Sequence, residues 1–306
     1  MLNQQIHRLM DDFPGALLPY YQAEMQAALE QHGLPPRDWF VLYLLLAIKP
    51  QPGNAQNLAG YLPYSSAAFI NGTLERAAGD LIQGDLLAGY HASNAGETAF
   101  YTAAADAQRA IDGAALVEPA RLQRMAETLE RLVTASLQAA EPGSKRHLAR
   151  SRLMATGPQA GWPSRIDQAI TDLYAFRDDA HQASWQDQPV DGHAWELLTL
   201  IWREAPQSVD KLFEQVAARG FEKDETLAAL DTLIGLGWIE DGQDELTVTA
   251  AGASIRDEAE ALTDRLYFDP WQILPDAALE QLRDDLEMYI NRLREESAAS
   301  SEAQAR

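Results

Sequence analysis

The sequence predicts a mainly α-helical protein with two small β-hairpins. Three observations lead to this fold class. Apolar residues recur at helical spacing along most of the 306 residues. Two short β-prone runs flank Asp241-Gly242, a dipeptide that favours a hairpin turn. The order of three helices and a hairpin expected over 193–268 is repeated, more loosely, over 39–112.

The later copy is the clearer one. Its expected elements are helices over 193–203, 209–219 and 222–235, strands at 238–240 and 246–249, and a final helix over 250–266. Ser208 suits the N-cap of the second helix, Gly220 suits its end, and Gly237 ends the third helix. Three helices followed by a hairpin form a winged helix-turn-helix. Its third helix normally enters the major groove of DNA, and the hairpin, called the wing, lies on the phosphates.

The earlier copy follows the same order. Its expected elements are helices over 39–48, 55–61 and 66–83, strands at 86–90 and 98–102, and a helix over 103–111. Asn54 and Ser65 are suitable N-caps, and the turn over 93–96 is expected at the wing tip. Alignment of the two copies pairs Tyr101-Thr102-Ala103-Ala104 with Val248-Thr249-Ala250-Ala251.

The predicted fold is therefore mainly α with small β-hairpin wings (α+β), in two tandem winged-helix domains with long amphipathic helices. The expected parts are an N-terminal helical arm (1–34), the first winged-helix domain (35–115), a long amphipathic helix (116–141), a linker (142–163), a connecting helix (164–192), the second winged-helix domain (193–272), a C-terminal helix (273–296) and a disordered tail (297–306). Leucine stripes on Glu118–Ala139 and Asp276–Arg294 predict a homodimer interface.

Composition narrows the class of protein. The sequence has no cysteine, which excludes disulfides and thiolate chemistry and fits the cytoplasm. No apolar run approaches the ~20 residues of a membrane span, and the first residues lack the build of a signal peptide, so no membrane association is expected. No complete catalytic constellation or glycine-rich phosphate loop is present. We therefore expect no enzyme, no metal and no cofactor.

Charge is distributed unevenly along the chain. The formal net charge is -22, of which residues 1–160 contribute -3 and residues 161–306 contribute -19. Nucleic-acid affinity comes mainly from Lys and Arg that release counterions, so the acidic second half repels phosphate. An acidic surface also promotes solubility, which is the simpler explanation of the overall charge.

Several motifs resemble a known family. They are Gly237-Trp238-Ile239 before the hairpin, Leu246-Thr247-Val248-Thr249-Ala250-Ala251-Gly252 after it, and the run from Asp264 to Trp271 before a leucine-striped helix. These are similar to winged-helix regulators of the MarR type, named for multiple antibiotic resistance. The whole chain resembles tandem winged-helix proteins of actinobacterial type, described as helix-turn-helix regulators, which carry Arg177-Asp178-Asp179-Ala180-His181 before the second copy. The resemblance implies dimerisation through the terminal helices.

The second copy departs from DNA-binding members of that family. Its third helix begins Glu222-Lys223-Asp224-Glu225, and its wing reads Glu240-Asp241-Gly242-Gln243-Asp244-Glu245, where a basic tip is expected. DNA contact is therefore expected through residues 64–96 of the first copy, within a dimer that supplies enough charge. The candidate residues are Ser65, Ser66, Asn71, Thr73, Arg76, His91 and Asn94, which can hydrogen-bond bases or phosphates. An ordinary polar helix surface explains the same residues.

A polar cluster precedes the second copy on a predicted helix. Helical spacing places Tyr174, Arg177, Asp178, His181 and Trp185 along its apolar side. The simplest explanation is a network of paired, buried groups. A pocket for a small anionic or aromatic effector is the sharper hypothesis, and a shared metal or an enzyme site centred on these residues are weaker alternatives.

The basic segment Lys145–Arg152 lies in the predicted linker. It could contact phosphate, but pairing with the adjacent acidic half of the same chain is favoured. Taken together, the residues favour a winged-helix transcriptional regulator that contacts DNA through the first copy, while the second copy senses a ligand or binds a partner. The alternative is a non-catalytic tandem winged-helix protein that does not bind DNA and docks a protein partner or small ligand.

Overall fold

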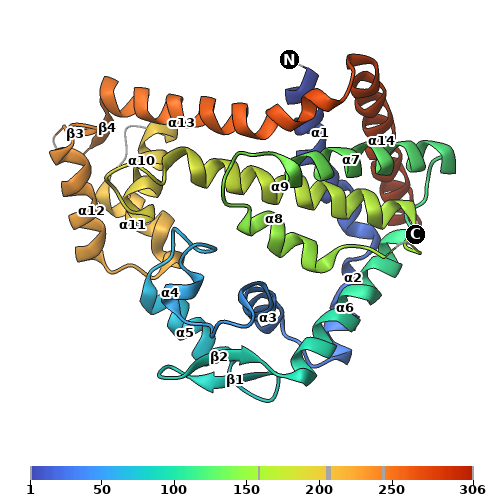
Figure 1. Ribbon diagram of the computed structural model, residues 1–306, viewed down its shortest axis with the longest axis horizontal. Helices are drawn as coiled ribbons and strands as arrows, with labels where there is room; N and C mark the ends of the chain where they lie inside the picture. The colour runs from blue at the N-terminus through green and yellow to red at the C-terminus, as the bar shows by residue number, and fades with distance from the viewer. Residues whose placement is uncertain (1, 158, 205–207, 243–244, 305–306) are drawn as a thin grey trace. The chain divides into compact units, whose positions relative to one another are not determined.

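The computed structural model describes residues 2–157, 159–204, 208–242 and 245–304, with side chains through Ala299. Helices make up most of the described chain, and two separate two-stranded antiparallel hairpins complete it (Figure 1). The predicted mainly α fold with small β wings is therefore confirmed. Within the described residues, we find no helix whose length and hydropathy would let it cross a membrane.

The chain folds into two compact units that do not follow sequence order. Unit 1 comprises 1–43, 94–179 and 266–306, and unit 2 comprises 44–93 and 180–265. Three helices contribute residues to both units: α3 (Pro36–Ile48), α9 (Trp162–Trp185) and α13 (Ala250–Phe268). Unit 2 thus contains both hairpins together with the helices that precede each of them.

The second copy agrees with the sequence-based expectation. Its elements are α10 (Gly192–Glu204), α11 (Val209–Val216), the 3-10 turn η3 (Ala217–Arg219), α12 (Lys223–Gly235), β3 (Ile239–Asp241) and β4 (Leu246–Val248). The Ser208 hydroxyl accepts a hydrogen bond from the amide of Lys211 at 3.3 Å, which confirms the predicted N-cap. Gly220 follows η3 with a φ of 76°. Part of the predicted wing, Gln243-Asp244, lies outside the described residues.

The first copy differs at its wing. Its elements are α4 (Ala55–Leu58), α5 (Ala67–Ala77), β1 (Ile82–Asp85) and β2 (Gly89–Ala92). The wing tip is Leu86-Leu87-Ala88, because the Asp85 carboxylate accepts hydrogen bonds from the amides of Leu87 and Ala88, both at 2.8 Å. The expected tip over 93–96 and the expected strand over 98–102 were wrong, since α6 (Asn94–Asp112) includes nearly all of both.

The two wings are closed in the same way, which corrects the alignment of the copies. The amide of Ser93 donates to the carbonyl of Leu81, and the amide of Thr249 donates to that of Trp238, both at 3.0 Å. The matching runs are therefore Ser93-Asn94-Ala95-Gly96 and Thr249-Ala250-Ala251-Gly252. At Gly252 an added Cβ would lie 2.0 Å from the carbonyl oxygen of Trp238, so this close approach requires glycine.

The two leucine stripes predicted to form a dimer interface are buried inside unit 1. Helix α14 (Asp276–Gln304) packs against α1 (Leu2–Leu17) and α7 (Pro119–Gln138) (Figure 1). The stripe residues buried there include Leu122, Met125, Leu129 and Leu132 of α7 and Leu279, Leu282, Leu286 and Ile290 of α14. These faces are already partnered within the chain and are not left open for a second copy. Helix α14 also continues through Gln304, across most of the segment expected to be a disordered tail.

The basic segment of the expected linker is also paired inside unit 1. It forms α8 (Arg146–Ser151), and the Asp179 carboxylate accepts hydrogen bonds from the amides of His147 and Leu148, both at 2.9 Å. Arg152 lies 2.7 Å from the buried Asp172. The favoured interpretation of this segment, pairing within the chain, is therefore confirmed for these contacts.

Asp167 of α9 provides a test of the electrostatics of unit 1. Burial raises the pKa of this carboxyl from 3.8 to about 6. Protonation of the Asp167 carboxyl therefore stabilises the folded state. This stabilisation is fully present below the pKa of the carboxyl in the unfolded chain and is lost as pH rises through its pKa in the folded protein. Asp167→Asn should therefore raise the free energy of unfolding at pH 7.5 by about 1–2 kcal/mol and flatten its dependence between pH 4 and 6. Urea denaturation at several pH values measures the free energy of unfolding and its pH dependence. As a control, substitution of the exposed Asp187 by Asn should change the free energy of unfolding by less than about 0.5 kcal/mol.

Candidate functional site

The third helix of the first copy, α5, begins in direct contact with the second copy inside unit 2. Ser66 is its N-cap, and its hydroxyl accepts a hydrogen bond from the amide of Phe69 at 3.0 Å. The same hydroxyl donates to the carbonyl of Gly220 at 2.6 Å, and the Ser66 amide donates to the carbonyl of Arg219 at 2.9 Å. Ser66 is only 6% exposed. The turn before α12 therefore covers the helix end that contacts bases in helix-turn-helix proteins.

Two glycines permit this close approach. Gly220 has a positive φ, and a Cβ added there would also lie 2.6 Å from the Cβ of Phe69. At Gly192, the first residue of α10, an added Cβ would lie 1.9 Å from the carbonyl oxygen of Pro63. Any side chain at either position would separate the two copies.

Aromatic rings continue the contact beside Ser66. The ring of Tyr64 lies 5.9 Å from that of Trp185, which stacks on Trp195 with ring centres 5.6 Å apart. The guanidinium of Arg219 lies 5.9 Å from the centre of the Tyr64 ring and 2.8 Å from the Glu196 carboxylate. The copies are thus joined by hydrogen bonds at Ser66 and by packed rings next to it.

Ser66→Ala tests the contribution of this contact. The variant loses an N-cap and leaves the partly buried carbonyl of Gly220 without its hydroxyl donor. We expect the free energy of unfolding to fall by about 1–2 kcal/mol. Urea denaturation measures this loss. Ser65→Ala is the matched control, and a loss as large in that variant would contradict the assigned role of Ser66.

The residues predicted to contact DNA fall into two groups. Ser66 and Asn71 are engaged within the chain, since the Asn71 side-chain oxygen accepts a hydrogen bond from the amide of Ala55 at 3.2 Å. Thr73 and Arg76 lie together on α5, 3.2 Å apart, with Arg76 exposed. The remaining three are the partly buried Ser65, the exposed His91 on β2, and the exposed Asn94 at the start of α6. Their contact with DNA stays a prediction.

The two wings contain no lysine or arginine. The first wing ends in leucines, with Leu87 99% exposed. The second carries exposed carboxylates at Glu240, Asp241 and Glu245. Neither residues 82–92 nor residues 239–248 include Lys or Arg, so the wings lack the charge that holds a duplex by its phosphates.

The outer face of α12 is apolar and acidic. Leu227 and Ile234, two turns apart, are each 39% exposed, and Asp224 and Asp231 are exposed on the same helix. Lys223 is paired with Asp210 at 2.7 Å. A helix that reads bases presents hydrogen-bonding and cationic side chains, whereas this one presents aliphatic side chains between carboxylates.

A buried arginine ties α13 to the second copy. Arg256 is 0% exposed, and its guanidinium lies 4.6 Å from the ring centre of Trp195 and 5.0 Å from that of Trp202. One of its amino groups donates to Glu260 at 2.6 Å. Burial lowers the pKa of Arg256, and the neighbouring Glu260 opposes this shift. The cation is thus held mainly by two indole rings and one partly exposed carboxylate.

The polar cluster predicted as a ligand site divides between two sets of contacts. In unit 1, the Tyr174 hydroxyl donates to Asp11, and its ring lies 5.6 Å from that of His7. In unit 2, His181 lies 3.5 Å from the Thr263 hydroxyl, and Trp185 belongs to the aromatic contact described above. The other two members are the partly buried Arg177 and the exposed Asp178. Their role in ligand binding stays a prediction.

Sequence reasoning missed the functional consequence of two features. The contact between Ser66 and Gly220 joins residues 154 positions apart, and no local pattern marks it. The helical spacing of Leu227 and Ile234 is typical of a buried face, yet each side chain is 39% exposed. No group of three or more His, Asp or Glu residues in the described ranges is placed to hold a metal ion.

In each copy the third helix follows a short turn and precedes a hairpin, as in helix-turn-helix proteins that carry a wing. The chain belongs to a helix-turn-helix family, whose pattern matches residues 71–300. No curated protein and no solved structure matches the chain.

Proposed function

We propose that the protein is a helix-turn-helix regulator that acts through a protein partner docked on the outer face of α12. In this proposal neither third helix reads DNA bases. The observation that carries the proposal is the covered N-terminus of α5, where Ser66 bonds to Gly220 at 2.6 Å. The N-terminus of the third helix in the first copy is thereby covered, and the second copy carries an excess of negative charge.

Charge and apolar surface together specify the partner. Unit 2 contains 21 Asp and Glu against 8 Lys and Arg, so it repels phosphate and attracts a basic protein surface. Leu227 and Ile234 supply apolar area that a partner can bury. A basic protein segment with an apolar face fits both features.

The resemblance to MarR-type winged-helix proteins supports a role in the regulation of transcription. We propose the following mechanism for that role. The protein partner bound on α12 controls the activity of a transcription complex. A homodimer, if it forms, uses faces other than the leucine stripes of α7 and α14, because unit 1 buries both stripes.

Photo-crosslinking in cells tests the proposed docking face. A benzophenone side chain at Leu227 should give one discrete crosslinked protein whose crosslinked peptide is basic, and Ile234→Asp should abolish this product. The matched control places the benzophenone at Leu137, a similarly exposed leucine of α7. The same product from both positions, or a product unaffected by Ile234→Asp, would contradict the proposal.

A second candidate function is DNA binding through the first copy. Family membership favours it, and so does the pairing on α5 of Thr73 with the exposed Arg76. If this candidate holds, affinity for duplex DNA should fall steeply with salt, and Arg76→Glu should weaken binding about tenfold or more. Fluorescence anisotropy measures both, with Arg203→Glu as the charge-matched control on another helix. Equal loss in the two variants would indicate non-specific attraction only.

A further inference from the structure

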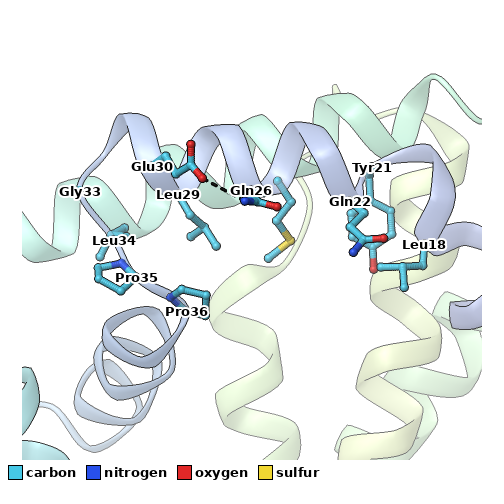
Figure 2. Close-up of a pocket in the computed structure, with 11 residues that line it drawn as sticks. Leu18, Tyr21, Gln22, Gln26, Leu29, Glu30, Gly33, Leu34, Pro35 and Pro36 are labelled. Atoms are coloured by element: carbon cyan, nitrogen blue, oxygen red, sulfur yellow. Dashed lines mark hydrogen bonds between the residues drawn. The ribbon is translucent and has the colours of Figure 1, made fainter.

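An apolar groove runs along α2 in unit 1. It has a volume of about 790 Å³, and its lining includes Leu18, Tyr21, Met25, Leu29, Leu34 and Pro36. Figure 2 shows Leu29, Leu34 and Pro36 around one end of the groove and Leu18, Tyr21 and Gln22 at the other. The volume lies within the range of about 300–1,000 Å³ that small-molecule sites occupy.

Helical spacing and one turn create the groove. The chain places Leu18, Tyr21, Met25 and Leu29 three or four residues apart, so they share one face of η1 (Leu18–Tyr20) and α2 (Gln22–Gln31). Gly33, with a φ of 63°, then reverses the chain, and the following Pro35-Pro36 forms the opposite wall. Leu29 and Leu34 are 8% and 1% exposed and form the floor.

The groove carries negative charge and no positive charge. None of the described residues that line it is Lys, Arg or His, whereas the Glu30 carboxylate lies on its rim, where the Gln26 amide donates to it at 3.0 Å. Burial, and next the charge of Asp167, raises the pKa of Tyr21, so its phenol is neutral at physiological pH. Arg37, just beyond the lining, is paired with Asp38 at 2.9 Å. An anion would meet no positively charged side chain among the described lining residues.

We propose that this groove binds a hydrophobic organic cation. Its apolar body packs against Tyr21 and Met25 over the Leu29 floor, and its positive charge faces the Glu30 carboxylate. The side chains satisfy the two requirements of such a ligand, because aromatic, thioether and aliphatic surfaces accept its body and a carboxylate stabilises its charge. Binding here is independent of what docks on α12.

Two ions of nearly equal size and opposite charge test the proposal. Isothermal titration calorimetry of the full chain should show saturable binding of tetraphenylphosphonium, and tetraphenylborate should bind at least about tenfold more weakly. Met25→Gln should weaken tetraphenylphosphonium binding about tenfold or more, because it places an amide against the apolar body. Glu30→Gln should weaken it about fivefold, as expected for a solvent-exposed ion pair.

Matched controls separate the groove from the general acidity of the chain. Met288→Gln changes an exposed methionine of α14, and Glu24→Gln removes one charge from α2 outside the lining. Both should leave affinity within about twofold of the parent protein. Equal binding of the two ions, or equal losses in control and groove variants, would overturn the proposal. A change in oligomeric state on Met25→Gln, measured by light scattering, would also overturn it, because the groove would then be a contact between copies.

Discussion

Arg256→Ala is expected to lower the free energy of unfolding by about 3–5 kcal/mol, because it removes a fully buried cation and the atoms that fill the space between two indole rings. The guanidinium lies 4.6 Å from the ring centre of Trp195 and 5.0 Å from that of Trp202, so truncation leaves a cavity between α10 and α13. Urea denaturation followed by tryptophan fluorescence measures both the stability and the environment of these rings.

Two further variants identify the cause of that loss. Arg256→Met keeps most of the packing volume while removing the charge, and its partner Glu260 is 29% exposed and can be solvated. We expect a loss of about 1 kcal/mol in this variant. Arg265→Ala removes an exposed arginine from the same helix and should change stability by less than about 0.5 kcal/mol. A loss below about 1 kcal/mol in Arg256→Ala would contradict the packing role.

Gly192→Ala is expected to lower the free energy of unfolding by about 2–3 kcal/mol. The new Cβ would lie 1.9 Å from the carbonyl oxygen and 2.7 Å from the carbonyl carbon of Pro63, and backbone atoms on both sides cannot yield cheaply. The first and second copies must then move apart. Hydrogen exchange should show faster exchange of the Ser66 amide, which donates to Arg219 in the parent protein.

The same chemical change at Gly235 provides the control. An added Cβ there meets no atom within 4 Å, and the residue lies in the last turn of α12. Gly235→Ala should leave the Ser66 amide unchanged and stabilise the protein by up to about 1 kcal/mol through helix propensity. If Gly192→Ala matched the parent protein in stability and exchange, the contact between the copies would be looser than described.

The second copy was predictable because its signals are local. The N-cap at Ser208, the left-handed Gly220 and the two β-prone runs of the hairpin each depend on a few residues, and the structure contains the cap, the glycine and the paired strands β3 and β4. The three carboxylates among residues 222–225 were also evident from the sequence. They already indicated that this copy is poorly suited to DNA.

The wing of the first copy was misplaced because its signals are not local. Leu86 and Leu87 read as the interior of a strand, yet they form the tip, and Asp85 closes the turn. The second strand is fixed by a partner far away in sequence, since the amide of Gly53 donates to the carbonyl of Tyr90 at 2.7 Å. A single sequence does not reveal which distant segment supplies such a hydrogen bond.

The candidate site was less predictable than the fold for the same reason. Ser66 was selected as a hydrogen-bonding residue free to contact DNA, but its hydroxyl and amide both bond to the second copy. The groove of unit 1 was not predicted, because the sequence indicated only a helical arm over residues 1–34. The groove depends on the turn at Gly33, which brings Leu34 and the prolines that follow beside the apolar face of α2.

The central claim is that unit 2 docks protein and does not read DNA. The most direct test is fluorescence anisotropy of labelled duplex fragments that together cover the protein's own genomic DNA, with the full chain at about 50 mM salt, where phosphate contacts are stronger than at physiological salt. The account predicts no saturable binding. Saturable binding that falls steeply with salt and is lost in Arg76→Glu would contradict it and establish the first copy as a DNA-binding element.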